Sequence, residues 1–310
     1  MNVSIIITTR NRAADLMQTL QAMKCVTMPD GLKPELLVVD NGSTDETAEV
    51  VRSCHLRKFP VRYTCERHAG QARARNRGLA ETTGEMVLFI DDDVRPSADW
   101  LAGMCEPMLQ YNACGVAGGV KLAPGLVRPW MSGFHRSWLA SSEWLDAEVP
   151  QSMVGANMGF SREVLRRVPA FDPELGPGAL GFGDDSLLAS QLLEAGYRII
   201  GRQKVFVEHH FDPSRLRRES WLEAATRRGK SSAYRGHHWE HWGWKLAVPR
   251  LLWTWCKLYA WQRRFWRTIR DEGCSEDELT LLFGFALLQA RLRERRRRRN
   301  YKRRGLVKLT

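Results

Sequence analysis

The fold of this chain is constrained most by short, largely apolar runs that alternate with stretches of helical periodicity in its first 90 residues. The runs are Val3–Thr8, Leu36–Val39, Val61–Thr64 and Met86–Ile90. A strand that is apolar along its length is buried on both faces, as strands are in parallel sheets whose connections are helices. The sequence therefore predicts an α/β fold with a mostly parallel sheet and helices on both faces.

Weaker signals predict the elements that follow residue 120. Met153–Ser161 is a candidate strand, and Asp184–Ala195 has the leucine spacing of a helix that Gly196 ends. Tyr197–Ile200 and Val205–Glu208 are short apolar runs, which predict two further strands.

Charge divides the chain near residue 214. Residues 1–214 carry 22 Lys and Arg against 26 Asp and Glu, a net of −4, whereas residues 215–310 carry 25 against 9, a net of +16. Eight of the 12 Trp lie between residues 221 and 266. We therefore expect an α/β domain over 1–214, an amphipathic helical region over 215–290 and an Arg-rich tail over 291–310. A basic part of this kind suits an anionic partner, either a membrane surface or nucleic acid.

The basic region contains one clear amphipathic pattern. Arg250, Lys257 and Arg264 recur every seven residues and share a helical face, and Leu251, Leu252, Trp255, Leu258 and Tyr259 lie largely opposite. Such a helix suits a membrane interface, but packing against the rest of the protein explains the pattern equally well. The longest uncharged stretch there, residues 279–290, is too short to span a bilayer, so we expect no transmembrane helix. The Arg-rich tail is expected to be solvated and disordered.

Cysteine usage indicates a reducing compartment. The seven cysteines are odd in number and none forms a C-x-x-C pair, which argues against a disulfide framework or a zinc ribbon. The chain also enters its first strand at Val3 without a basic, apolar leader. We expect a cytoplasmic protein that is peripheral at the inner face of the cell membrane.

Three consecutive acids, Asp91, Asp92 and Asp93, follow the fourth apolar run. Carboxylates crowded at a strand end repel one another, and a divalent cation such as Mg²⁺ or Mn²⁺ removes that repulsion. The carboxyl ends of strands in an α/β sheet are also where ligands bind. Helix capping is the alternative, but one cap needs one acid. If the extended backbone continues, Asp91 and Asp93 point to the same side.

Five motifs, in order, resemble the family 2 glycosyltransferases. They are the run from Ile5 to Arg12, the run from Val38 to Asp45, Gly70 to Gly78, the acid triplet, and Gly183-Asp184-Asp185 with His209-His210. The likeness covers about residues 1–215 and implies a GT-A fold. It further implies a metal-dependent, inverting transfer of sugar from a nucleotide donor, with a UDP-sugar expected.

The resemblance implies a nucleotide site at the strand ends. Thr8, Arg10 and Asp40 would contact the nucleotide, with the Asp40 carboxylate accepting from uracil N3–H. Asp-Asn-Gly-Ser is also a strong turn sequence without any ligand. Arg75 could meet the base or the phosphates. Arg73, Arg75 and Arg77 cannot all face the same ligand on a helix, so at least one of them is a solvated surface charge. Asp91 would contact the ribose and the metal.

The resemblance also implies the catalytic and metal residues. Asp93 and Asp91 match the family's D-x-D motif and would hold the metal, joined by His209 rather than His210. Asp185 would be the catalytic base and Asp184 its partner, although the two roles could be exchanged or shared with helix capping. Asn157, in a segment of small residues, would contact the sugar or the acceptor.

These features together predict an enzyme of cell-surface polysaccharide or glycoconjugate synthesis. The acceptor would be a hydroxyl of a lipid-linked sugar or a glycan, and the basic region would meet an anionic membrane surface. A nucleotidyltransferase is an alternative, but the segment after the first strand lacks the expected glycines. A nucleic-acid-binding protein is another, although no specific nucleic acid is expected because the acid triplet would repel a phosphate backbone.

Overall fold

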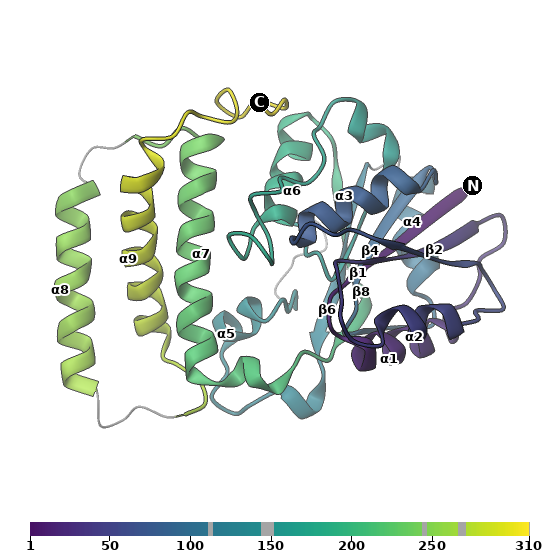
Figure 1. Ribbon diagram of the computed structural model, residues 1–310, viewed down its shortest axis with the longest axis horizontal. Helices are drawn as coiled ribbons and strands as arrows, with labels where there is room; N and C mark the ends of the chain where they lie inside the picture. The colour runs from purple at the N-terminus through teal and green to yellow at the C-terminus, as the bar shows by residue number, and fades with distance from the viewer. Residues whose placement is uncertain (111–113, 144–151, 244–246, 266–270, 310) are drawn as a thin grey trace. The chain divides into compact units, whose positions relative to one another are not determined.

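The computed structural model describes residues 1–110, 114–143, 152–243, 247–265 and 271–309 (Figure 1). The chain divides into two compact units. The first comprises Met1–Pro173 and Asp184–Phe211, and the second comprises Glu174–Gly183 and Asp212–Thr310. The short segment Glu174–Gly183 thus belongs to the second unit, which the sequence does not indicate.

The first unit is built on a mixed sheet with eight strands in the described residues, in the order β3-β2-β1-β4-β7-β6-β8-β5. Their bounds are β1 Asn2–Thr9, β2 Lys33–Asp40, β3 Val61–Cys65, β4 Met86–Asp91, β5 Val94–Pro96, β6 Gly115–Leu122, β7 Asn157–Ser161 and β8 Ile199–His209. β3, β2, β1 and β4 are parallel, as the four apolar runs predict. β7 is antiparallel to both of its neighbours, and β5 is antiparallel to β8.

The prediction of two strands after residue 196 is wrong, because both runs belong to β8. The register between β6 and β8 shifts between Gly118 and Gly119, where Arg202 and Phe206 are the successive partners. The polar residues between the two apolar runs therefore form a bulge rather than a turn. Gly119 permits the bulge, since a Cβ there would lie 2.2 Å from the Gln203 carbonyl oxygen.

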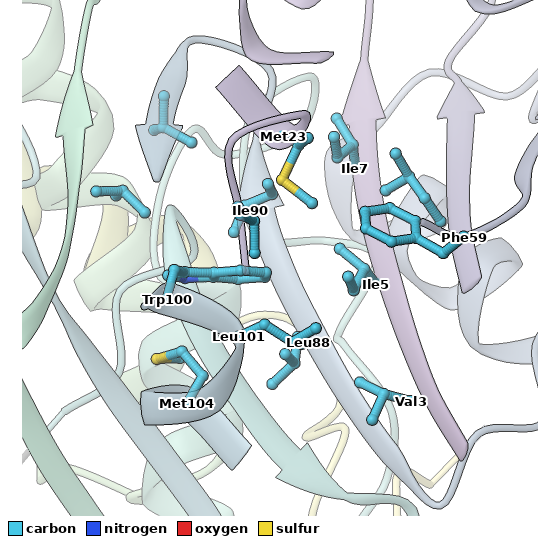
Figure 2. Close-up of a cluster of buried hydrophobic side chains, with 14 of the residues drawn as sticks. Val3, Ile5, Ile7, Met23, Phe59, Leu88, Ile90, Trp100, Leu101 and Met104 are labelled. Carbon is cyan, nitrogen blue, oxygen red and sulfur yellow. The ribbon is translucent and has the colours of Figure 1, made fainter. Parts of the chain in front are cut away.

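Helices cover both faces of the sheet. α1 Ala13–Met23, α2 Thr47–Ser53 and α4 Trp100–Gln110 contribute to one apolar core with β1 and β4. Figure 2 shows part of this core, where Val3, Ile5 and Ile7 of β1 share one apolar cluster with Leu88 and Ile90 of β4 and with Trp100, Leu101 and Met104 of α4.

α3 Gln71–Glu81 packs against the other side of β1 and β2. It approaches closely at Gly78, where a Cβ would lie 2.7 Å from Ile6. The unit also contains α5 Gly133–Trp138, α6 Asp184–Glu194 and the 3₁₀ segments Pro124–Leu126 and Arg162–Arg166.

The second unit is helical. Its elements are the 3₁₀ segment Pro213–Leu216 and the helices α7 Arg218–His238, α8 Ala247–Phe265 and α9 Glu276–Glu294. α9 lies between α7 and α8 and contacts both (Figure 1). Gly229 of α7 allows close packing, because a Cβ there would come within 2.7 Å of the α9 backbone. None of the helices in the described parts of the chain has the length and apolar character needed to cross a membrane.

The expectation of a disordered tail is wrong for the described residues that follow α9. Tyr301 is only 1% exposed. Asn300 Nδ2 donates to the Tyr234 hydroxyl at 2.7 Å, and Arg304 N donates to the Trp239 carbonyl at 2.7 Å. The chain folds back on α7 because a large aromatic ring and several backbone groups find partners there, despite the surrounding positive charge.

Candidate active site

The carboxyl ends of the parallel strands bring the expected nucleotide-contacting residues to one edge of the sheet. Thr8 of β1 pairs in register with Asp91 of β4, and Thr9 pairs with Asp40 of β2. Gln71 Nε2 lies 3.4 Å from Thr8 Oγ1 and 3.3 Å from Asp91 Oδ1, so this amide bridges the two strand ends. The ends of β1, β2 and β4 meet in this way because these three strands run in the same direction.

Asp40 is almost fully buried in a turn at the end of β2. Its Oδ1 accepts from Ser43 N at 2.8 Å and its Oδ2 accepts from the Tyr63 hydroxyl at 2.8 Å. Burial and the hydrogen bond to Asp40 raise the pKa of Tyr63 to about 12. The turn interpretation of Asp-Asn-Gly-Ser is therefore confirmed. Each carboxylate oxygen has a second lone pair, so a further donor such as a base N–H could still be accepted.

The acid triplet leaves the sheet in a turn, and the assumption that its backbone stays extended is wrong. β4 ends at Asp91, and Asp92 and Asp93 form the turn before β5. Arg12 Nη1 lies 3.0 Å from Asp92 Oδ1 and 2.8 Å from Asp93 Oδ2. Burial raises the pKa of Asp92 to about 7, Arg12 opposes the rise, and Asp93 adds to it. The turn therefore concentrates negative charge that one arginine only partly neutralises.

Arg12 was not singled out in the sequence. It lies in the run from Ile5 to Arg12 that carries the family resemblance, immediately before α1. A basic residue at that point, facing a cluster of acids in the same motif set, is the signal that could have identified it.

Of the two adjacent histidines, His209 lies beside the triplet. Its Nδ1 is 2.9 Å from the Leu139 carbonyl oxygen, which can only accept, so Nδ1 carries a proton. Nε2 is 3.4 Å from Asp93 Oδ1. His210 instead pairs with Glu208, at 2.6 Å.

These donors suit a divalent cation bound together with a substrate. His209 Nε2 and Asp93 Oδ1 lie 3.4 Å apart, and an imidazole nitrogen beside a carboxylate oxygen is a pair of atoms that could both ligate a cation. No group of three or more His, Cys, Asp or Glu side chains that could hold a metal occurs among the described residues. Mg²⁺ commonly takes one or two carboxylates plus substrate phosphates. The residues present therefore fit a cation whose remaining ligands come from a diphosphate.

Arg75 is enclosed rather than open to a ligand. Its Nη1 is 2.6 Å from Asp184 Oδ2 and its Nη2 is 3.4 Å from Asp91 Oδ1, and the side chain is 3% exposed. The guanidinium also lies over the Phe171 ring, 5.4 Å from its centroid. A Cβ on residue 155 would come within 2.2 Å of Arg75 Nη2, so the glycine there leaves the space that the guanidinium occupies. Arg75 is thus engaged by two acids of the site, and its expected contact with the nucleotide stays a prediction.

The two acids at the start of α6, Asp184 and Asp185, differ in their burial and in their partners. Burial raises the pKa of Asp184, and Arg75 partly offsets that rise. Asp185 is less buried, and its Oδ2 accepts from Gly155 N at 2.9 Å while its Oδ1 accepts from Ser186 N at 2.6 Å. An anion in the first turn of a helix is stabilised by the helix dipole. Asp184 is thus committed to an internal ion pair, whereas Asp185 is the accessible acid of the two.

Asn157 does not offer its amide to a ligand. It is fully buried, its Oδ1 accepts from Trp100 Nε1 at 2.8 Å, and its Nδ2 donates to the carbonyls of Gly119 and Val205 at 2.9 and 3.1 Å. The expected contact between Asn157 and a sugar or acceptor has no support in these contacts and stays a prediction. Its polar side chain satisfies backbone groups around the β8 bulge instead.

The mixed sheet with helices on both faces has the GT-A fold. Residues 4–168, more than half of the chain, match the family described as glycosyl transferase family 2. The chain belongs to this family and is a glycosyltransferase. That finding favours the expected enzyme over the nucleotidyltransferase and the nucleic-acid-binding alternatives.

Two curated relatives and two solved structures illustrate the likeness. The chain is 36% identical to "Glycosyltransferase AglE" of Haloferax volcanii, over 32% of this chain and 33% of that protein. It is 29% identical to "Succinoglycan biosynthesis protein ExoM" of Rhizobium meliloti, over 44% of this chain and 45% of that protein. The matches thus span a third to less than half of these relatives.

The solved structures share the fold. The mannosyltransferase PcManGT of Pyrobaculum calidifontis, described in complex with GDP-Man and Mn²⁺, aligns with a TM-score of 0.56 at 24% identity, over 92% of this chain and 69% of that chain. GalNAc-T7, described with UDP, GalNAc and Mn²⁺, aligns with a TM-score of 0.53 at 15% identity, over 68% of this chain and 43% of that chain. The predicted fold class is confirmed.

Proposed function

We propose that this glycosyltransferase is metal-dependent and inverts the anomeric configuration, moving a sugar from a UDP-sugar to an acceptor hydroxyl. The observation that carries the proposal is the division of roles between Asp184 and Asp185. Asp184 is paired with Arg75, which leaves Asp185 as the acid able to reach a substrate. A single accessible carboxylate opposite a leaving diphosphate is what single displacement requires.

In the proposed reaction, Asp185 takes the proton of the acceptor hydroxyl as that oxygen attacks the anomeric carbon. The bond between the anomeric carbon and the phosphate oxygen breaks, and the nucleoside diphosphate leaves. The Gly155 N–H donates to the Asp185 carboxylate and orients it. Asp93 and His209, with Asp91 nearby, would hold the divalent cation, which supplies neutralisation of the charge on the leaving diphosphate.

The nucleotide would lie across the carboxyl ends of β1 and β2. Thr8 lines that edge, Arg10 is exposed just beyond β1, and Asp40 presents an acceptor to a base N–H. PcManGT is described with GDP-Man and GalNAc-T7 with UDP, so both bases occur on this fold. We retain UDP because a single carboxylate matches the single N3–H of uracil.

The acceptor is proposed to be a lipid-linked sugar or a glycan in cell-surface polysaccharide or glycoconjugate synthesis. The name of ExoM, a succinoglycan biosynthesis protein, supports this class of product. We place the enzyme at the inner face of the cell membrane, with the basic residues of 215–290 and 291–310 turned to an anionic surface and residues 1–214 performing the chemistry. That placement rests on the charge difference between the parts.

Calorimetric titration with UDP, with and without Mn²⁺, tests the site. Asp93→Ala should abolish the Mn²⁺-dependent part of the binding. Asp185→Asn should keep UDP binding but lower transfer by about 10²- to 10⁴-fold, the usual contribution of a general base. Asp30→Asn, at an exposed loop position, is the matched control. Equal transfer by wild type and Asp185→Asn would exclude Asp185 as the base, and retained configuration in the product, seen by NMR, would exclude inversion.

A further inference from the structure

One face of α8 carries large apolar side chains that the described residues of the helical unit leave about half exposed. Leu252 is 60% exposed, Trp255 52% and Tyr259 51%, and their spacing of three and four residues puts them in one row. The rings of Trp255 and Tyr259 stack, with centroids 5.9 Å apart. Exposed apolar residues gathered in this way mark an interaction surface.

The opposite side of the same apolar stripe is already used for packing. Thr254 and Leu258 are buried, Leu251 and Trp261 are half-buried, and the Thr254 methyl group lies toward Gly284 of α9. The stripe is therefore wider than its contact with α9 requires. Packing within the protein therefore explains one side of α8 and does not explain the exposed row on the other side.

Charge around this row indicates what covers it. α8 contains no acidic residue, and Arg263 lies beside the row, with its guanidinium carbon 5.7 Å from the centroid of the Tyr259 ring. Further round the helix, Lys257 Nζ lies 3.8 Å from the centroid of the Trp253 ring, which is itself 59% exposed. Aromatic and leucine side chains together with arginine and lysine are the composition of helices that lie in an anionic membrane interface.

The charge of the whole unit argues against a second copy of the chain as the occupant. The helical unit carries 25 basic and 11 acidic residues, a net of +14, and the α/β unit carries 22 and 24, a net of −2. Two helical units brought face to face would repel one another, whereas each basic residue near an anionic bilayer contributes about 1 kcal/mol of attraction.

We propose that α8 docks the protein on an anionic phospholipid bilayer. Leu252, Trp255 and Tyr259 enter the headgroup region, and Arg263 beside them lies against the lipid phosphates. The inference rests on the proposed membrane location of the enzyme and identifies the surface responsible. The exposed arginines after α9 add long-range attraction, while Arg297 is held in the helical unit by Glu174 at 2.5 Å.

Flotation of the full chain with phosphatidylcholine vesicles, with and without phosphatidylglycerol, tests the proposal. The wild type should bind only the anionic vesicles. The triple variant Leu252→Ser/Trp255→Ser/Tyr259→Ser should lower the partition coefficient at least about tenfold, because its apolar row is lost. The control Leu109→Ser, which removes an apolar side chain 49% exposed on α4, should leave partitioning unchanged.

Three results would overturn the inference: a wild-type protein that ignores anionic vesicles, a triple variant that binds them as well as wild type, or a wild-type dimer in sedimentation velocity that the triple variant lacks. The last would assign the row to a second copy. UDP binding by each protein is measured alongside. A wild type that binds UDP but no vesicles rejects the membrane surface and leaves the proposed reaction standing, whereas intact UDP binding by the triple variant shows that this variant is folded.

Discussion

Arg75→Met removes the cation from a buried cluster of acids, and it should be strongly destabilising. Arg75 and Asp184 are 3% and 4% exposed and meet at 2.6 Å. Removing one partner of a buried pair typically costs about 3–5 kcal/mol, since the remaining charge is uncompensated. Arg227→Met is the matched control: its partner Glu223 also lies within 2.5 Å, but both are about half exposed, and such pairs contribute about 0–1 kcal/mol.

The loss should depend on pH. Burial raises the pKa of Asp184 above its ordinary 3.8, and Arg75 opposes that rise. Without Arg75 the folded-state pKa rises further, so between 3.8 and that value the folded protein holds more protons than the unfolded one. Stability then falls as pH rises through this window. The difference between wild type and Arg75→Met should therefore be larger near pH 8 than near pH 5.

Urea denaturation followed by far-ultraviolet circular dichroism measures both effects, and a double-mutant cycle isolates the pair. Adding Asp184→Asn to Arg75→Met should recover about 1–3 kcal/mol, because the second change removes the stranded charge. An Arg75→Met protein within about 1 kcal/mol of wild type at neutral pH, or a cycle that is additive to within about 0.5 kcal/mol, would refute the reasoning.

Three further outcomes are expected. His209→Ala should weaken Mn²⁺-dependent UDP binding by at least about tenfold, and His210→Ala should change it little, as titration calorimetry can show. Gly155→Ala should destabilise the protein by about 2–4 kcal/mol in urea because its Cβ would lie 2.2 Å from a buried guanidinium, whereas Gly125→Ala, with no atom within 4 Å, should be neutral. Tyr301→Ala should lower the unfolding free energy by about 3–5 kcal/mol in urea denaturation, because the ring is buried. An unchanged unfolding free energy would favour the original expectation that the tail is disordered.

The parallel half of the sheet could be predicted because its information is local. Each apolar run specifies a strand that is buried on both faces, and the connecting helices oblige neighbouring strands to run parallel. The meeting of Thr8, Asp40 and Asp91 at one edge follows from that rule alone. The bulge in β8 could not be predicted, because it depends on the absence of a side chain at Gly119, some 80 residues away in the sequence.

The partners of charged residues were the least predictable part of the site. Arg75 and Asp184 are 109 positions apart, and no local pattern shows that they meet. Asn157 looked suited to sugar hydroxyls because polar groups among small residues often meet ligands, yet its amide is used within the core. Pairing over long sequence distances decides whether a polar side chain is available, and that information appears only once the chain is folded.

The segment Glu174–Gly183 complicates any attempt to separate the two units by cutting the chain. It precedes the acid pair directly, but its anchors lie in the helical unit: Arg297 contacts Glu174 at 2.5 Å, and Ser231 Oγ donates to the Leu180 carbonyl at 3.1 Å. A fragment that stops at Phe211 keeps this segment and removes both anchors. Loss of activity in a C-terminal truncation would then report a disturbed segment before the acid pair as readily as a lost membrane contact, so point substitutions on α8 are the cleaner genetic test.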